Sequence, residues 1–261
     1  MPPILDRNFQ DLVVCPLCKT ALKWLRNECV CNSCGHRYSR TISGVWNFII
    51  QPPKFLRQIN YEMWKQTQKD YEVWGRNLME TYEDHLADIK TVHGIHTSEF
   101  TLAGKVLDVG GHQGRLRHFL SGETSYLCAD PCGTVFNGLD GNPALLNAYP
   151  CLLEPCNFLQ AHAERLPLRE STFDYVHLRS VLDHFFDPYL ALCEARRVLH
   201  WGGGVMIGTA VTGDQSPIRE GSGIKNLLSR FRKKVRDEGL KTGLLAVAKR
   251  ISGGGERDVH L

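Results

Sequence analysis

One stretch of the chain, Val106 to Gly114, constrains the fold more than any other. Its first four residues, VLDV, are typical of a buried strand, and the next five, GGHQG, of a glycine-rich turn that opens a helix. Glycine lets the backbone approach a ligand closely, because a Cβ at such a turn would collide with it. Asp130 ends the next apolar run, where nucleotide-binding folds place the acceptor for ribose hydroxyls. This half of the chain is therefore predicted to bind a cofactor that contains adenosine.

The loop has the pattern Asp-x-Gly-x-x-x-Gly, in which Asp108 precedes the glycines. A dinucleotide needs a helix N-terminus free to donate N–H groups to its pyrophosphate, whereas a carboxylate before the glycines suits a cationic or amine-bearing ligand. The loop resembles the first motif, Asp/Glu-x-Gly-x-Gly-x-Gly, of the class I S-adenosylmethionine (SAM)-dependent methyltransferases. His112 stands at the middle glycine of that motif. We therefore expect residue 112 to have an ordinary backbone conformation.

Later motifs follow in the order and spacing of the same family. Residues 157–168 resemble its third strand and adenine-contacting turn, with His162 in place of the usual aspartate. Residues 171–178 resemble its fourth strand, and residues 179–188 resemble the loop beside the methyl-transfer site. The similarity covers residues 105–210 and is typical of the type 11 methyltransferase group.

The resemblance implies a fold. We expect an α/β protein with a Rossmann-like, doubly wound parallel sheet. An amphipathic helix over 191–199, a glycine turn at 202–204 and an apolar strand over 205–208 are the expected next step of such a sheet. No strand pair is recognisable after Ala210, so the last two strands of the class are predicted to be missing and the chain to be truncated or shortened.

The resemblance also implies the site residues. Cofactor-binding roles fall on Asp108, Gly110, Gly111, Gly114, Asp130, Ala163, Glu164 and Arg179. Asp108 is expected to orient the methionine amine, and Asp130 the ribose hydroxyls. Catalytic roles fall on Arg179, Asp183 and His184, among which His184 is the best-placed base by residue type. An Asp-His pair at such a junction also serves as a helix cap and packing group.

Two Cys-x-x-Cys knuckles mark the amino-terminal part. Cys15, Cys18, Cys31 and Cys34 have the spacing of a closed tetrahedral zinc site. Four protein ligands leave no position for water, so this Zn²⁺ is expected to be structural. Cys29 is either a spare thiol or a competitor of Cys31. A reduced thiol cluster without metal is the alternative. The small ribbon is similar to those before some methyltransferase domains, as in the 23S rRNA guanine methyltransferases.

The remaining parts complete the predicted organisation: a zinc ribbon over 1–50, a linker and helical lid over 51–104, the SAM-binding domain over 105–212 and a basic amphipathic tail over 213–261. A single helix is predicted from about Phe55 to Ile89, because its aromatic residues recur at helical spacing. It either packs on the sheet or covers the cofactor. The tail from Asp214 onward carries eleven Lys or Arg and six Asp or Glu, which suits RNA, an anionic membrane surface, an acidic substrate or a solvated helix face.

Composition limits the compartment and the partners. Ten cysteines without a signal peptide or a long apolar segment favour a reducing cytoplasm and no transmembrane segment. The net charge of +3 is too small to indicate nucleic acid by itself.

Three functions compete at this stage. The favoured one is methyl transfer from SAM to an N, O or C atom of a small metabolite, glycan or lipid-linked acceptor. The second is an RNA-base methyltransferase, whose ribbon offers stacking and basic groups: Trp24, Arg26, Arg37, Tyr38 and Arg40. The third is a non-catalytic SAM-binding or interaction protein.

Overall fold

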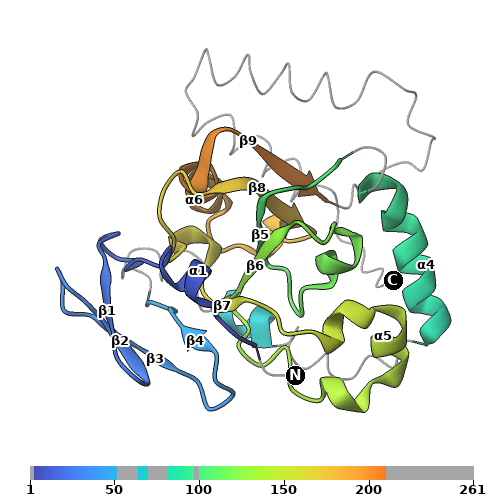
Figure 1. The fold of residues 1–261 in the computed structure, drawn as a ribbon, viewed down its shortest axis with the longest axis horizontal. Helices are drawn as coiled ribbons and strands as arrows, with labels where there is room; N and C mark the ends of the chain where they lie inside the picture. The colour runs from blue at the N-terminus through green and yellow to red at the C-terminus, as the bar shows by residue number, and fades with distance from the viewer. Residues whose placement is uncertain (1–2, 52–63, 70–80, 97–99, 210–261) are drawn as a thin grey trace. The chain divides into compact units, whose positions relative to one another are not determined.

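The structure, a computed structural model, describes residues 3–51, 64–69, 81–96 and 100–209 (Figure 1). A nine-stranded sheet forms its centre, with strand order β1-β2-β3-β4-β7-β6-β5-β8-β9. The strands are β1 (Leu22–Trp24), β2 (Glu28–Cys31), β3 (Arg37–Arg40), β4 (Trp46–Asn47), β5 (Lys105–Val109), β6 (Ser125–Asp130), β7 (Phe158–Gln160), β8 (Phe173–Arg179) and β9 (Leu199–Gly208). The main helices are α1 (Arg7–Gln10), α4 (Tyr82–Gly94), α5 (Pro143–Ala148) and α6 (Pro188–Val198).

Strands β5 to β9 form the predicted parallel sheet. The chain runs outward from β5 to β6 and β7, then crosses to the other side of β5 to form β8 and β9. The strand order therefore reverses between β5 and β8. In open α/β sheets, the crevice at such a reversal, beyond the carboxyl ends of the strands, is the usual ligand site.

The central strands β5 and β6 are buried on both faces, as their mostly apolar residues predict. Leu107 and Val109 of β5 lie in the core with Ala195 of α6, whereas Val106 faces a second cluster that includes Tyr126. Figure 1 draws α6 on one side of β5 and β6, and α4 and α5 on the other. Asp187 fixes the start of α6, because its side chain accepts the Leu190 N–H (3.1 Å).

The ribbon belongs to the same sheet. Strands β1 to β4 pair antiparallel, and β4 then pairs in parallel with β7. In that pairing Trp46 lies opposite Leu159, and the Phe48 N–H donates to the Gln160 carbonyl (2.7 Å). The edge of the parallel sheet at β7 is thereby covered by the ribbon, as Figure 1 shows.

The prediction of one helix from Phe55 to Ile89 is wrong at Thr81. That residue is extended (φ −79°, ψ 166°), and it caps α4 through a reciprocal pair of contacts with Asp84. A Thr-x-x-Asp sequence offers this capping box, which starts a new helix and so ends any earlier one. Residues 64–69 are helical, but most of the predicted helix before Thr81 lies outside the described residues.

Two other local features differ from the sequence-based expectations. The glycines at 202–204 lie inside β9 at a register irregularity opposite β8, not in a turn before the strand. The helix after the glycine loop is a short 3-10 segment, η3 (Arg115–Phe119).

Within the described residues, no helix is long and apolar enough to span a membrane. The basic tail and the proposed loss of the last two strands concern residues 210–261, which lie outside the described residues.

Candidate functional site

The glycine loop follows β5 and turns through left-handed backbone conformations. Gly110 and Gly114 have φ of +73° and +81°. A Cβ at Gly111 would collide with the carboxylate of Asp108, so this position also requires glycine. His112 has φ +51°. The expectation of an ordinary backbone at residue 112 is therefore wrong, and the imidazole occupies a glycine-type conformation.

This conformation makes a direct prediction for stability. A non-glycine residue in the left-handed conformation costs roughly 1–2 kcal/mol of folding free energy. Glycine avoids this cost but loses more backbone entropy on folding, so the net gain in stability is smaller. We expect His112→Gly to raise the free energy of unfolding by about 0.5–1 kcal/mol, measured by urea denaturation. The matched control is His112→Ala, which removes the same imidazole but keeps the left-handed backbone. Equal stability of the two variants would contradict this explanation.

Asp108 lies beneath the loop and is only 2% exposed. Its Oδ2 accepts the Tyr126 hydroxyl (2.6 Å), and its Oδ1 lies 2.8 Å from Nδ1 of His177 on β8. The Nε2 atom of His177 is buried and has no hydrogen-bond partner among the described residues. The His96 ring, from the segment after α4, packs 5.4 Å from that of His177. Asp108 thus anchors β5, β6 and β8 to one another at the base of the loop.

Asp130 joins the loop to the end of β6. Its Oδ2 accepts the His112 N–H (3.0 Å), and its Oδ1 accepts the Cys132 N–H (2.8 Å). Burial raises the pKa of the Asp130 carboxyl above its ordinary value, against the lowering effect of His112 and these N–H groups. Each carboxylate oxygen can accept a further hydrogen bond. The structure therefore brings Asp130 and the glycine loop together, as the sequence predicts.

The segment after β7 forms a second wall. Ala163 and Glu164 are buried in the short 3-10 segment η6 (Ala163–Arg165). Glu164 accepts the Asp187 N–H (3.2 Å), and burial raises the pKa of its carboxyl to about 7. His162 packs edge-on against Trp64 and Phe186, at 5.3 and 5.5 Å between ring centroids. Burial lowers the pKa of His162 to about 4, so this imidazole is neutral near pH 7.

A cleft of about 390 Å³ opens at the reversal of strand order. Its lining is polar and charged: Asp84, His85, Asp88, Arg115, Arg179 and Ser180. The first three come from α4, Arg115 follows the glycine loop, and the last two lie at the end of β8. The Arg179 guanidinium donates to Asp88 (3.0 Å), which also accepts the Tyr149 hydroxyl (2.7 Å). Helix α4 thus forms one wall of this cleft.

Sequence reasoning identified only Arg179 among these lining residues. Arg115 follows the last glycine of the loop directly, which is a usable signal. The α4 residues had a weaker sequence signal, because they lie in the segment that was predicted either to pack on the sheet or to cover the cofactor.

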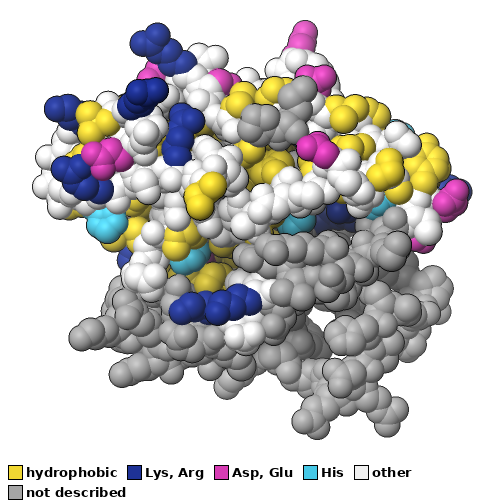
Figure 2. Space-filling model, turned by 90° about the horizontal axis from the view of Figure 1, so that it is seen from below, with side chains coloured by type: hydrophobic (Ala, Val, Ile, Leu, Met, Phe, Trp, Pro, Cys, Tyr) yellow, Lys and Arg dark blue, Asp and Glu magenta, His cyan; other side chains and the backbone are white. Residues whose placement is uncertain are grey.

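Figure 2 shows one face of the molecule, on which Lys and Arg side chains gather at the left.

Asp183 and His184 lie apart from this lining. They belong to the 3-10 segment η7 (Leu182–His184) that follows β8, and their side chains are 59% and 33% exposed. The His184 ring lies 3.7 Å from the Asp183 carboxylate. The indole of Trp64 donates to the main-chain carbonyl of His184. Their catalytic roles stay predictions.

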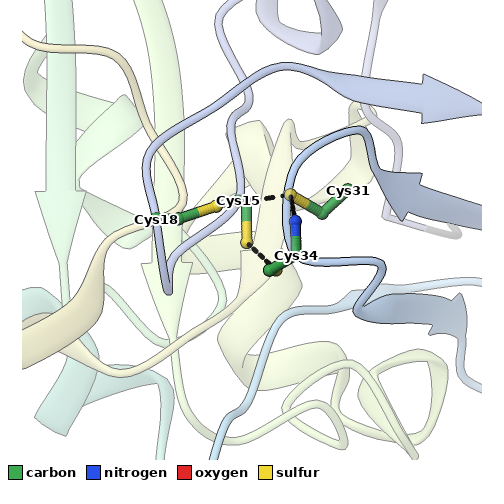
Figure 3. Close-up of side chains that lie close together, drawn as sticks. All are labelled: Cys15, Cys18, Cys31 and Cys34. Carbon is green, nitrogen blue, oxygen red and sulfur yellow. Dashed lines mark hydrogen bonds between the residues drawn. The ribbon is translucent and has the colours of Figure 1, made fainter.

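The four predicted cysteine ligands converge on one point. Their sulfur atoms all lie within 4.8 Å of one another, with Cys15 and Cys34 at 3.7 Å and Cys18 and Cys31 at 3.3 Å (Figure 3). Sulfurs bound at about 2.3 Å to one tetrahedral ion stand about 3.8 Å apart. The four thiols therefore fit a metal ion.

The surroundings of the Cys31 sulfur favour a thiolate, whereas hydrogen bonds with the neighbouring cysteine sulfurs raise the pKa of Cys34. Burial opposes ionisation, but hydrogen bonds with Thr20 and from the Cys34 and Ser33 N–H groups lower the pKa of Cys31 to about 5. Cys29 lies outside the cluster, and burial raises the pKa of its thiol to about 12. Cys31, and not Cys29, is therefore the fourth member of the cysteine cluster.

The ribbon residues proposed to stack on RNA are only partly accessible. Tyr38 is 3% exposed, and its hydroxyl lies 3.1 Å from the Cys15 sulfur. Trp24 packs edge-on against Trp46, at 4.9 Å between ring centroids. Tyr38 is therefore inaccessible to a base, whereas Trp24 is half-buried and keeps part of its ring exposed.

Three solved structures are similar: the YcgJ protein of Bacillus subtilis (21% identity, 59% of each chain, TM-score 0.36), the PH0226 protein of Pyrococcus horikoshii (19%, 64% of this chain and 67% of that one, 0.43) and a SAM-dependent methyltransferase of Aquifex aeolicus (19%, 50% and 77%, 0.36). The chain spans about three fifths of the YcgJ protein. No curated protein matches it.

One protein-family model matches a segment of this chain that begins inside β5 and ends inside β9. The matched segment therefore includes the glycine loop, Asp130 and η6. Residues 107–207 match the family described as a methyltransferase domain.

Proposed function

We propose that this protein transfers a methyl group from SAM to an N, O or C atom of a polar acceptor, such as a small metabolite, a glycan or the headgroup of a lipid-linked precursor. The observation that carries the proposal is the charged cleft at the strand reversal, directly beside the glycine loop. Within the described residues, no apolar side chain lines this cleft. Such a lining suits a charged cofactor end and a polar acceptor.

The residues of the loop region fit the nucleoside part of the cofactor. Gly110 and Gly114 let the loop turn through left-handed conformations, and Asp130 keeps acceptor capacity for ribose hydroxyls. Ala163 and Glu164 border the proposed adenine position. SAM supplies the activated methyl group on its sulfonium, so the protein mainly has to align donor and acceptor.

The cleft fits the amino-acid part of the cofactor, which carries one carboxylate and one ammonium. Arg115 and Arg179 offer cations, and Asp84 and Asp88 offer anions. The Arg179–Asp88 pair is about 40% exposed on both sides, and such pairs contribute about 0–1 kcal/mol. A ligand carboxylate can therefore recruit Arg179 at little cost. Asp108, whose two oxygens have internal partners, is proposed to hold the loop and the amine side of this site.

A variant of Arg179 tests this assignment. We expect Arg179→Gln to weaken SAM binding by about ten- to a hundredfold, because a charged hydrogen bond contributes about 1.5–3 kcal/mol. Arg196→Gln is the control, since Arg196 is exposed on α6 and does not line the cleft. Calorimetric titration of both variants with SAM measures the difference. Equal affinities would remove Arg179 from the cofactor site.

We also propose that the metal of the cysteine cluster is Zn²⁺ and that it is structural. Four thiolates occupy every position of a tetrahedral ion, so none is left for water. His184, oriented by Asp183, remains our proposed base for acceptors that must lose a proton.

Methyl-labelled SAM distinguishes the acceptor classes. Metal-loaded protein is incubated with labelled SAM and, separately, with the small-molecule, glycan, lipid and RNA fractions of a cell extract. Label in the small-molecule, glycan or lipid fraction supports the proposal. Label in RNA favours the RNA-base reading, and SAM binding without label in any fraction favours a non-catalytic SAM-binding protein.

A further inference from the structure

The ribbon contacts both ends of the segment that borders the proposed adenine position. The Val14 N–H donates to the Pro167 carbonyl (2.9 Å), and the Arg169 N–H donates to the Leu12 carbonyl (2.9 Å). Together with the pairing of β4 and β7, these contacts hold residues 159–169 from the ribbon side.

Lys19 adds a side-chain link from the metal knuckle itself. It follows Cys18 directly, and its N–H donates to the Cys15 carbonyl (2.8 Å). Its ammonium donates to the Leu166 carbonyl (2.9 Å) and to Glu194 of α6 (2.6 Å). The two charged side chains are only 29% and 13% exposed, so this ion pair is better protected from water than the Arg179–Asp88 pair.

Arg197 completes the link from the other side. Its guanidinium donates to the carbonyls of Leu166 (3.2 Å) and Leu168 (2.7 Å) and forms two hydrogen bonds with Glu194 (2.7 and 2.8 Å). Lys19 and Arg197 thus share the Leu166 carbonyl and the Glu194 carboxylate. The turn that follows Glu164 is fixed between the metal knuckle and α6.

We infer that the cysteine knuckle is a positioning device for the cofactor, in which Lys19 transmits the order of the metal-loaded ribbon to the segment 162–168. Metal binding and SAM binding are then coupled, and each strengthens the other. The inference rests on the proposed function, because Ala163 and Glu164 must border the cofactor for the coupling to exist.

Coupling of this kind is reciprocal, so it can be measured from the metal side. We expect saturating SAM to raise the metal affinity of the wild-type protein about tenfold, measured by competition with a chromophoric zinc chelator. In Lys19→Met the cluster remains intact and binds one metal ion, but SAM raises the metal affinity less than threefold and itself binds about tenfold more weakly. Lys19→Arg, which keeps donors for Glu194 and Leu166, restores part of the coupling.

The control is Lys23→Met, because Lys23 is exposed on β1. It should behave as wild type in both titrations. If wild-type protein binds SAM but its metal affinity does not respond, the inference is wrong and the proposed function stands. Unchanged SAM affinity in a folded, metal-loaded Lys19→Met protein overturns it equally. Failure of wild-type protein to bind SAM overturns both.

Discussion

Replacing Asp108 by alanine is expected to lower the free energy of unfolding by about 3–5 kcal/mol and to abolish measurable SAM binding. The variant leaves the Tyr126 hydroxyl and Nδ1 of His177 buried without their partner. Each buried polar group that loses its hydrogen-bond partner costs about 1–3 kcal/mol, because it stays out of water, and this variant affects two such groups. Urea denaturation and calorimetry with SAM measure the two effects.

Two further variants separate the causes. Asp108→Asn keeps the shape and one oxygen acceptor, so it should lose less stability than Asp108→Ala while still lacking the charge. Glu123→Ala, in an exposed turn before β6, should match wild type in both measurements. If Asp108→Ala were as stable as wild type, the buried contacts of Asp108 would not hold β5, β6 and β8 together.

Loss of the metal is expected to have the second large effect. Cys18→Ser removes one exposed member of the cysteine cluster without opening a cavity in the core. Structural zinc sites contribute several kcal/mol of folding free energy, so we expect the variant to lose its zinc and to melt at least 10 °C lower. Metal content by atomic absorption and a thermal melt measure both. Chelation of the wild-type metal should give the same lowered melting temperature.

Cys193→Ser is the matched control for this variant. Cys193 is also exposed but lies on α6 outside the cluster. It should retain one zinc ion per chain and the wild-type melting temperature. A Cys18→Ser protein that keeps both would show that the four thiols are not a metal site.

The elements and motifs that the sequence predicted correctly have strong local signals. Each Cys-x-x-Cys knuckle is a tight turn that brings its two sulfur atoms together. The spacing of the two knuckles therefore predicts the cluster that the structure shows. The apolar run before the glycine loop predicts β5, and the position of Asp130 predicts its approach to that loop. In each case a short stretch of chain contains both the pattern and its physical cause.

The remaining features depend on contacts between distant parts of the chain. The pairing of β4 with β7 joins Trp46 to Leu159, and a two-residue strand carries no pattern that would predict its partner. The partners of Asp108 lie on β6 and β8, so finding them requires the strand register. The left-handed conformation of His112 opposes the preference of the residue itself, so the surrounding loop must impose it. The Thr-x-x-Asp sequence at Thr81 is a local signal for a helix start, which the spacing of the aromatic residues does not contain.

The most direct test of the central claim is calorimetric titration of SAM into the zinc-loaded protein of residues 1–261. The proposed site predicts one binding event per chain with a dissociation constant in the micromolar range, and loss of that event in Asp108→Ala. Absence of binding in a folded, zinc-loaded sample would contradict the claim that the glycine loop, Asp130 and the cleft form a SAM site.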